Sequence, residues 1–501
     1  MVLPLSIFSV SLEPENLLVL ISVLVIFALM MSKIGVRFGA PVLLVFLILG
    51  MLVGADGLGV QFAEYESAER LGHFAMSIIL FAGGLETSLR ETRPVMRQGI
   101  LLSTLGVLVT VLLTGGFIAL ALRPLIGGVA ASVLGCFMLA AIMSSTDSTS
   151  VFSVLRGQRL KLRENLAPLL ELESGSNDPL ALSLTAILVG ILSKQDLLFA
   201  SDSTLTLVGA SLLALLLQIG IGLGMGFAIG YGARWLLGKV KLSSPSLTAI
   251  MVLGIGLFAN GLASMLGGNG LLALYVTAIL IGNKAPLGGE KKDILKFFDA
   301  MSWLMQLLMF LMLGLLARPS QMPQVLLPAL LIGLFMMLVA RPASVFLCLL
   351  PFRGLSVRAK TLISWVGLKG AGPILFALSP VVAGLEGSAE IFNIVFVITL
   401  LSLVCQGMTL SPASKLLKLS YEKDPDVQSF GLEMPEEMGM LRDHVVGEEE
   451  LLNGATLREL SLPHGIRVVM VKRGNKFLVP HGSMPLQSGD HLLIVMGETD
   501  N

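Results

Sequence analysis

The sequence predicts an all-α polytopic membrane protein of about 13 transmembrane helices, followed by a small α+β cytoplasmic module. Three observations lead to this fold class. The chain has 501 residues, of which 54% are hydrophobic and only 14% charged, whereas an ordinary soluble domain has about 25% charged residues. Long apolar runs recur up to residue 420. From residue 421 onward, the composition becomes acidic and rich in turn residues.

The low charge excludes a soluble enzyme, because so few charged side chains could not cover a soluble protein of this size. The formal net charge is zero, but residues up to Ser420 include 27 basic and 20 acidic side chains, and the remainder include 7 and 14. An acidic tail argues against nucleic-acid binding, which needs Lys and Arg to replace phosphate counterions. We therefore expect the lipid bilayer, and no nucleic acid, as a partner.

The apolar runs predict the transmembrane helices, since about 20 residues are needed to cross the hydrocarbon core. The runs lie at about 15–32, 39–56, 71–88, 98–121, 128–155, 166–192, 204–237, 245–264, 269–283, 297–317, 324–350, 361–384 and 391–411. The first has no basic segment before it, so we expect an uncleaved helix rather than a signal peptide.

Basic residues predict the orientation, because Lys and Arg concentrate in cytoplasmic loops. Alternate loops and the segment after the last run hold 21 Lys and Arg residues, and the other loops hold four. This alternation places the N-terminus outside and the C-terminus in the cytoplasm, with the protein in the inner (plasma) membrane.

The tail predicts a linker and a folded module. Residues 421–450 are acidic and read as a linker, and residues 451–501 read as the module. Thr456 and Glu459 have the spacing of a helix capping box. Short β-like runs follow, separated by Gly-containing turns, at Ile466–Val471, Lys476–Val479 and His491–Met496.

Ionisable residues inside apolar runs are the strongest functional signal, because each costs on the order of 3 kcal/mol at mid-membrane. They are Asp147, Glu171, Glu173, Asp178, Arg341 and Lys369. Asp147 lies in the run SSTDSTS, whose hydroxyl groups compete for backbone hydrogen bonds and loosen the helix. Such a break offers carbonyl, hydroxyl and carboxylate oxygens, which suit Na⁺, K⁺ or H⁺.

The sixth run holds three further carboxylates, of which Glu173 and Asp178 lie in the sequence ESGSNDP. Asp178 precedes Pro179, which removes a backbone donor, while Glu173 and Asn177 share a helix face. Polar residues that only hold helices together would explain a lone Ser or Asn better than two carboxylates beside a helix break. For Glu173 we expect a structural ion pair with Arg341.

A second broken helix is predicted at GLKGAGP, where glycines and a proline surround Lys369. It lies seven runs after the first, in the opposite sense, as inverted repeats of runs 1–6 and 8–13 would place it. Asp147 and Lys369 would then neutralise the opposed ends of the half-helices. We favour this charge compensation over direct cation contact for Lys369.

With these motifs the chain resembles the NhaP branch of the monovalent cation:proton antiporters. The resemblance implies 13 helices, inverted repeats, a mobile core domain and a homodimer. It maps the cation site onto Thr146, Asp147, Ser174, Asn177 and Asp178, and the structural ion pair onto Glu173 and Arg341. One departure is that many relatives carry Arg where this chain has Lys369.

The tail resembles the C-terminal subdomain of RCK/TrkA potassium-regulatory modules. That resemblance narrows the group to potassium/proton exchange and cell-volume regulation. It implies dimerisation and a small regulatory ligand such as a nucleotide. A plain assembly domain without a ligand is the alternative.

These observations predict a secondary transporter, not an enzyme. One K⁺ or Na⁺ would exchange for H⁺, without a required cofactor, as Asp178 binds either the proton or the cation. Asn177 is neutral where a second Asp would titrate, so we expect electroneutral exchange. A potassium channel gated by the module is the alternative, although the chain has no TVGYG-type filter. No P-loop is present for an ATP-driven pump.

Overall fold

The computed structural model describes most of residues 41–422, except 61–63, 159, 194–203, 241 and 353, and a few residues between 19 and 30. In the tail it describes 441–447, 456–460, 466–474 and 476–496. The chain forms two compact units, Met1–Tyr421 and Glu422–Asn501. Most of the first predicted span and of the predicted linker lies outside the described residues.

Long apolar helices dominate the first unit. Seven described helices are long and apolar enough to cross a membrane, and four shorter apolar helices accompany them. The seven are Leu89–Leu125, Leu166–Ser193, Val208–Lys239, Pro245–Met265, Gly288–Leu316, Pro319–Cys348 and Ser388–Leu416. This confirms the predicted multi-pass class, and the total of 13 spans stays a prediction.

The first half of this unit contains ten described α-helices and the second half nine. They begin with α2 (Val42–Val53), α3 (Tyr65–Glu86), α4 (Leu89–Thr92), α5 (Met96–Leu101), α6 (Val107–Phe117), α7 (Val133–Ile142), α8 (Ser148–Gly157), α9 (Leu166–Ser193), α10 (Thr204–Lys239) and α11 (Pro245–Met265). The rest are α12 (Gly270–Lys284), α13 (Lys291–Leu316), α14 (Met322–Phe335), α15 (Arg341–Cys348), α16 (Val357–Trp365), α17 (Ala371–Phe376), α18 (Leu378–Val382), α19 (Ser388–Ser402) and α20 (Met408–Leu416).

Short 3₁₀-helical and π-helical segments extend several of these helices. The described π-helical segments are η3 (Leu102–Gly106), η4 (Ile118–Leu122), η10 (Met336–Ala340) and η11 (Leu403–Gly407). The 3₁₀ segments are η2 (Arg93–Val95), η5 (Arg123–Leu125), η6 (Gly128–Ala131), η8 (Gly288–Glu290) and η9 (Pro319–Gln321). Strands β1 (Leu160–Leu162) and β2 (Ser420–Glu422) pair across the end of the unit.

Local sequence explains where several helices begin. Ser132 accepts a hydrogen bond from Gly135 N at the start of α7, and Asn269 accepts one from Leu272 N at the start of α12. These are ordinary N-caps, which satisfy amide groups that the helix leaves unpaired. The first of these caps begins α7, the helix that leads into the first broken segment.

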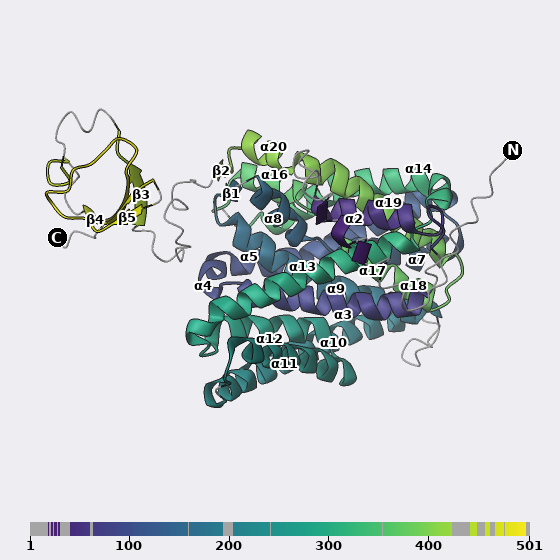
Figure 1. Ribbon diagram of the computed structural model, residues 1–501. Helices are drawn as coiled ribbons and strands as arrows, with labels where there is room; N and C mark the ends of the chain where they lie inside the picture. Colours follow the sequence, from purple (N-terminus) through teal and green to yellow (C-terminus); the bar gives the residue numbers. More distant parts are fainter. Residues whose placement is uncertain are drawn as a thin grey trace. The chain divides into compact units, whose positions relative to one another are not determined.

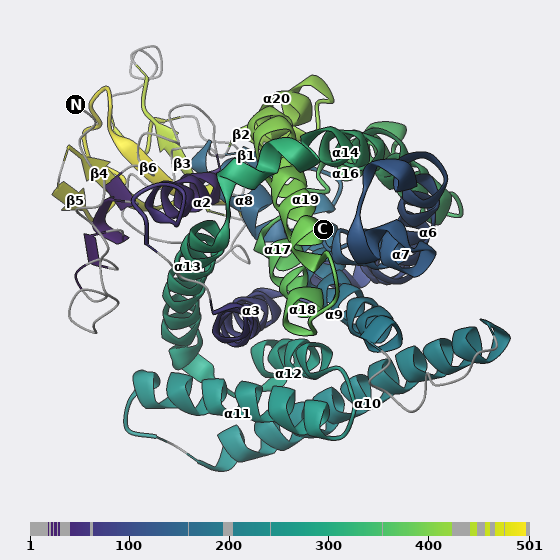
Figure 2. The ribbon, with the colours of Figure 1, turned by 90° about the vertical axis from the view of Figure 1, so that its right-hand side faces the viewer.

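The helices of the first unit run mostly side by side (Figure 1). In the view turned by 90°, α10, α11 and α12 form one edge, α17 to α19 lie near the centre, and α6 and α7 lie on another side (Figure 2). Two helices are broken: residues 143–147 separate α7 from α8, and 366–370 separate α16 from α17. The two breaks meet, because Asp147 N donates a hydrogen bond to Leu368 O at 2.9 Å.

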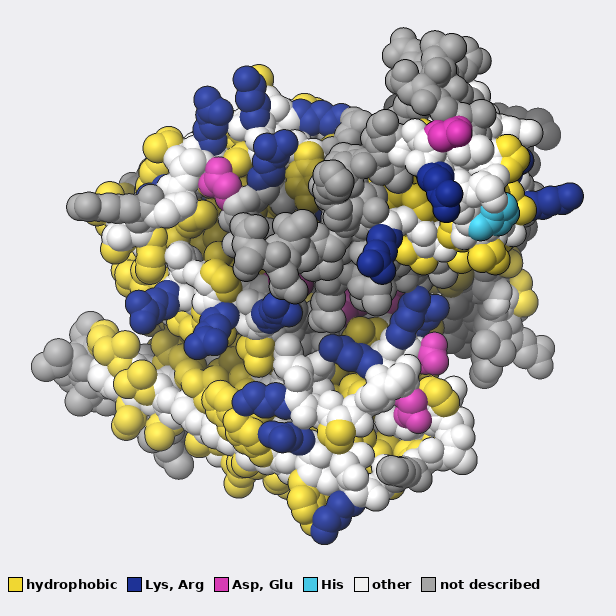
Figure 3. Space-filling view, turned by 90° about the vertical axis from the view of Figure 1, so that its left-hand side faces the viewer, with side chains coloured by type: hydrophobic (Ala, Val, Ile, Leu, Met, Phe, Trp, Pro, Cys, Tyr) yellow, Lys and Arg dark blue, Asp and Glu magenta, His cyan; other side chains and the backbone are white. Residues whose placement is uncertain are grey.

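Basic side chains gather at one end of the helical unit, where α4 and α5 begin and α12 ends. Figure 3 faces this end and shows far more Lys and Arg than Asp and Glu on it. Arg90, Arg93, Arg97 and Lys284 are exposed there. The side of the bilayer that this end faces stays a prediction.

The described part of the C-terminal unit is a four-stranded antiparallel sheet of order β3-β6-β4-β5. Its strands are β3 (Leu441–Val445), β4 (Ile466–Arg473), β5 (Lys476–Leu478) and β6 (His491–Met496). The strand β3 pairs with the distant β6. Residues 441–445, which lie in the segment predicted to be a linker, therefore belong to the sheet. At Thr456 one hydrogen bond of the predicted capping box is present, because Thr456 N donates to Glu459 Oε2. The described residues 456–460 form a β-bridge and turns, not a helix.

Candidate cation-binding site

The first break is built from short hydroxyl side chains. Ser144 Oγ donates to Ala141 O at 2.7 Å, which satisfies a carbonyl at the end of α7. Asp147 directly precedes α8. Its Oδ1 accepts from Thr149 N at 2.9 Å and Ser150 N at 3.2 Å, and its Oδ2 accepts from Ser150 Oγ at 2.5 Å. A carboxylate at a helix N-terminus is favoured by the helix dipole. Asp147 is therefore strongly held by its own half-helix.

Asp178 projects from the unbroken α9 toward this break. Its Oδ1 accepts a hydrogen bond from Ser145 Oγ. Among the described residues, no Lys or Arg forms an ion pair with Asp178. The carboxylate is thus positioned by a neutral hydroxyl, which leaves its charge open to neutralisation by a proton or a cation.

Three polar side chains form an oxygen-rich cluster between α9 and the break. Asn177 Nδ2 donates to Thr146 Oγ1 at 2.6 Å, and Thr146 Oγ1 lies 3.3 Å from Ser174 Oγ. The Asn177 carbonyl oxygen is buried without a hydrogen-bond partner in the described part of the chain. Buried acceptors are normally paired, so an orphaned oxygen beside two hydroxyls is a fitting ligand for a small hard cation.

Glu173 faces a different neighbour from Asp178. Its Oε1 lies 2.5 Å from Arg341 Nη2, with 2% and 9% of the two side chains exposed. The contact is an ion pair without an aligned hydrogen bond to either Glu173 oxygen. Arg341 begins α15 directly after the π-helical η10. The structure therefore brings together Thr146, Ser174 and Asn177, and separately Glu173 and Arg341.

Lys369 lies in the second break and reaches across to the first. Its Nζ donates to Ser145 O at 2.9 Å, and its backbone N donates to Ser402 Oγ at 2.9 Å. Ser145 follows the C-terminal end of α7, where a cation offsets the negative end of the helix dipole. Ser145 thus contacts Asp178 through its hydroxyl and Lys369 through its carbonyl.

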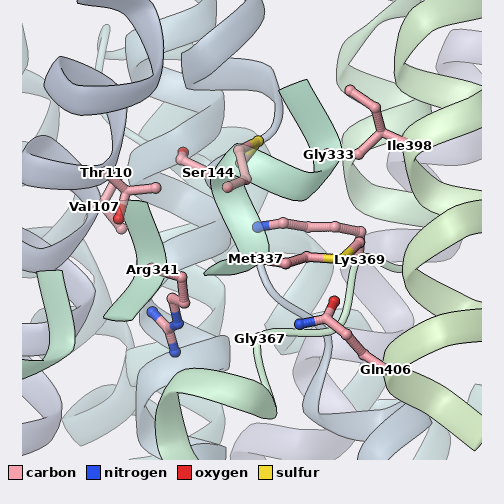
Figure 4. A pocket seen from close by; sticks show the side chains of 11 residues that line it. Val107, Thr110, Ser144, Gly333, Met337, Arg341, Gly367, Lys369, Ile398 and Gln406 are labelled. Carbon is pink, nitrogen blue, oxygen red and sulfur yellow. The ribbon is translucent and has the colours of Figure 1, made fainter. Parts of the chain in front are cut away.

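A pocket lies beside Lys369 and Arg341 (Figure 4). Thr110, Ser144 and Gln406 supply its other polar side chains. Gln406 Nε2 donates to Trp365 O and its Oε1 accepts from Ser402 Oγ, so it holds the chain that enters the second break. Both deep cations therefore line one pocket.

Gly370 explains why the second break can approach Asp147 so closely. A β-carbon added at Gly370 would overlap the Asp147 carboxylate, and one added at Gly372 would lie 3.1 Å from Ser145 Oγ. The backbone of the second break therefore packs directly against the acidic side chain of the first. Only glycine permits this contact at Gly370 without movement of Asp147.

Sequence reasoning missed several supporting residues. Ser145 and Ser150 stand in the SSTDSTS run, but nothing in that run distinguishes them from its other hydroxyls. Asn269 Nδ2 donates to Pro179 O at 2.6 Å and to Ser183 Oγ at 2.7 Å. Its GGNG context marks a turn and an N-cap, a signal that could have drawn attention to it.

The helical unit and the tail each match a known family. Residues 19–416 match the transmembrane sodium/hydrogen exchanger family, and residues 441–500 match the TrkA-C domain. The chain belongs to the sodium/hydrogen exchanger family. Two predictions are thereby confirmed: the exchanger relationship of the helical unit and the TrkA-C domain of the tail.

Curated relatives of this exchanger extend over nearly the whole chain. The K(+)/H(+) antiporter NhaP2 of Shewanella sp. (strain ANA-3) is 37% identical over 479 residues, which cover 94% of this chain and 79% of that protein. The K(+)/H(+) antiporter NhaP of Alkalimonas amylolytica is 36% identical over 500 residues, which cover 97% and 82%. Both names confirm the prediction of a secondary transporter rather than an enzyme.

A solved structure supports the fold of the exchanger unit. The sodium proton antiporter MjNhaP1 from Methanocaldococcus jannaschii superposes with a TM-score of 0.65 at 22% sequence identity. The match covers 79% of this chain and 97% of that chain. At this identity the likeness establishes the fold alone.

Proposed function

We propose that this exchanger carries K⁺, with Na⁺ as the alternative cation, against protons at a single site centred on Asp178. Thr146, Asp147, Ser174 and Asn177 complete the site. Asp178 binds either the proton or the cation. Because the two ligands compete for one carboxylate, exchange follows without a second coupling device. The broken helices would move as a core against the remaining spans, which is the usual motion of inverted-repeat transporters.

The contacts of Asp178 are the main support for this proposal. The carboxylate accepts from Ser145 and forms no ion pair with a described Lys or Arg. A carboxylate inside an apolar helix without a fixed counter-charge is expensive in the membrane. It is stabilised when it takes up a proton or an alkali cation, which are the two cargoes.

Asn177 supports electroneutral one-for-one exchange. Its side chain is neutral, 1% of it is exposed, and its amide is committed to Thr146. An aspartate in that place would add a second titrating group and a second proton. Exchange by this chain should therefore not respond to an imposed membrane potential.

K⁺ as the cargo rests on the relatives named K(+)/H(+) antiporters at 36–37% identity. Thr146, Asn177 and Asp178 bring oxygen ligands that suit Na⁺ as well. Measuring exchange with K⁺, Na⁺ and Li⁺ in the same vesicles decides between them.

Asp178→Asn tests the site directly. Purified protein in proteoliposomes with a pH-sensitive dye inside should exchange K⁺ for H⁺, and Asp178→Asn should lose that exchange. Wild-type exchange should fall as pH drops, because a protonated Asp178 cannot bind the cation. Residual exchange by the folded Asp178→Asn protein would contradict the proposal.

The proposal also covers the membrane, the orientation and the oligomeric state of the protein. We place the protein as a homodimer in the plasma (inner) membrane, with the basic end of the helical unit in the cytoplasm. The TrkA-C domain would then act from the cytoplasm as a regulatory or assembly domain. A nucleotide ligand for it stays a prediction from the resemblance.

A further inference from the structure

The second break interrupts one helical hydrogen bond at a defined place. In a continuous α-helix the amide of residue 369 would donate to the carbonyl of residue 365, four residues earlier. Here α16 ends at Trp365 and α17 begins at Ala371. Trp365 O accepts from Gln406 Nε2 at 2.9 Å, and Lys369 N donates to Ser402 Oγ at 2.9 Å. Both ends of the missing helical bond are thus satisfied by side chains of another span.

The two side chains that replace this bond also bond each other. Ser402 Oγ donates to Gln406 Oε1 at 2.7 Å. A serine hydroxyl has a single proton, so Gln406 takes that proton and leaves the Ser402 oxygen to accept from Lys369 N. Three hydrogen bonds therefore join the amide of Lys369 to the carbonyl of Trp365, and we call them the Ser402–Gln406 bridge.

The bridge is enclosed by the protein. Only 0% of Ser402 and 1% of Gln406 are exposed. Ser402 ends α19, and Gln406 lies in the π-helical η11, a rare kind of segment that often occurs at functional sites. Gln406 and Lys369 line the same pocket (Figure 4). At this burial both polar side chains would be costly without the partners that the break supplies.

The bridge ends at the residue that reaches the candidate site. Lys369 Nζ donates to Ser145 O at 2.9 Å, and Ser145 Oγ donates to Asp178 Oδ1. Without the bridge, Lys369 N and Trp365 O are free to form the helical bond, and rewinding of that turn would move the lysine side chain away from Ser145. The geometry of Asp178 therefore depends on a contact that begins at Gln406.

We propose that Gln406 is a positioning residue for cation binding, which acts through Ser402 to hold the second break open. The open break keeps Lys369 on the Ser145 carbonyl, and with it the Ser145 hydroxyl on Asp178. The inference rests on the proposed function and adds a residue from outside the oxygen cluster. Gln406 itself does not contact the cation.

A purely stabilising bridge would behave differently. Gln406→Met keeps a side chain of similar length and removes the amide. If the bridge only stabilises the fold, this change lowers the thermal midpoint, and the folded protein binds K⁺ as the wild type does. If the bridge positions the site, the folded variant has an apparent KM for K⁺ about tenfold higher, as expected for one buried hydrogen bond, with a nearly unchanged maximal rate.

The experiment compares the wild type with two variants in proteoliposomes. Gln406→Met is the test variant, and Gln306→Met is the matched control. Gln306 on α13 is also buried, with 3% exposed, and its Nε2 donates to Ser302 Oγ one turn earlier in the same helix, at 3.0 Å. Initial rates of K⁺-driven proton movement at several K⁺ concentrations give the maximal rate and the apparent KM.

The thermal midpoint adds a measurement of K⁺ binding that does not depend on transport. A ligand that binds the folded state raises the midpoint as its concentration increases. Gln406→Met should need about tenfold more K⁺ than the wild type for the same rise. Choline in place of K⁺ gives the baseline of each protein, and Gln306→Met should follow the wild-type curve.

Two variants of Ser402 decide the inference if Gln406→Met does not fold. Ser402→Thr keeps the hydroxyl that joins Lys369 N to Gln406, so its apparent KM should stay close to that of the wild type. Ser402→Ala removes the hydroxyl and should raise the apparent KM. Equal apparent KM values for the two folded Ser402 variants would contradict the positioning role.

The outcomes separate this inference from the proposed function. An apparent KM of Gln406→Met within twofold of the wild type, alongside an inactive Asp178→Asn, overturns the role of Gln406 and leaves the carrier in place. Exchange that persists in Asp178→Asn defeats the proposed function itself. A raised apparent KM in Gln406→Met with a normal Gln306→Met supports the positioning role.

Discussion

Glu173 and Asp178 are two carboxylates on one helix, five residues apart, and they have opposite surroundings. Glu173 is in contact with the Arg341 guanidinium, and both side chains are almost completely buried. Asp178 accepts from the Ser145 hydroxyl and is half-buried. Lys369, the other deep cation, donates to a backbone carbonyl instead of pairing with Asp178.

The difference shows that two carboxylates on one membrane helix can differ in whether their charge is already balanced by a fixed partner. A carboxylate with a permanent counter-charge has no need of a second cation, so it contributes to the fold. A carboxylate held by neutral donors keeps its charge available. In the function proposed for Asp178, the partner of the carboxylate, more than its depth in the membrane, separates the structural acid from the transporting one.

Glu173→Ala should give the largest loss of folded protein. It leaves Arg341 buried without its counter-charge, which costs about 3–5 kcal/mol. The yield of monodisperse protein in size-exclusion chromatography, together with its thermal midpoint, measures the effect. The double variant Glu173→Gln with Arg341→Gln removes both charges and should recover part of the loss. A fully stable Glu173→Ala protein would erase the distinction between the two acids.

Gly370→Ala probes the contact between the two breaks and should have a smaller effect. The new methyl group would overlap the Asp147 carboxylate, and overpacking of this kind costs about 1–3 kcal/mol. We expect a lower thermal midpoint and slower exchange, because Asp147 must move away from Thr149 and Ser150. Gly83→Ala is the matched control, since nothing lies within 4 Å of a β-carbon there. Equal behaviour of the two variants would contradict tight packing at the crossing.

Asp490 in the tail extends the comparison to the C-terminal unit. Arg473 donates to both of its carboxylate oxygens, at 2.8 and 2.7 Å, and 1% of the Asp490 side chain is exposed. Burial alone would raise the pKa of Asp490, but the hydrogen bonds from Arg473 and from Gln487 N hold that pKa below its ordinary value of 3.8. Like Glu173, this acid has a permanent partner.

The lowered pKa gives Asp490 a stabilising role that depends on pH. The contribution is fully present above pH 3.8, the ordinary value of the group, and is lost as pH falls through the lower folded-state pKa. Asp490→Asn should cost the tail about 1–2 kcal/mol near neutral pH, measured as faster amide hydrogen exchange in β4 and β6 of the full chain. The gap between the variant and the wild type should narrow as pH falls below 3.8. A gap that is independent of pH would exclude the charge as its cause.

The sequence predicts the exchanger fold and the residues of the site because charge in an apolar helix is costly and therefore conspicuous. Asp147, Asp178, Arg341 and Lys369 stand out for that reason alone. The contact between Glu173 and Arg341 also follows, since a buried acid and a buried base are each unfavourable without the other.

Other features could not be predicted, because they depend on how the chain turns. Ser145 is one hydroxyl among several in its run, and only the path of the break aims it at Asp178. The strand Leu441–Val445 contains Arg, Asp and His, so its pattern does not indicate a strand, and its pairing with β6 is remote in sequence.

The hydrogen bond from Asp147 N to Leu368 O joins the two crossing segments through their main chains. A main-chain link is independent of side-chain identity, so drift in the neighbouring sequence leaves it intact. It ties the segment that carries Asp147 to the turn that carries Lys369. In the proposed transport cycle, residues 143–147 and 366–370 should therefore move together as one rigid body relative to the surrounding helices.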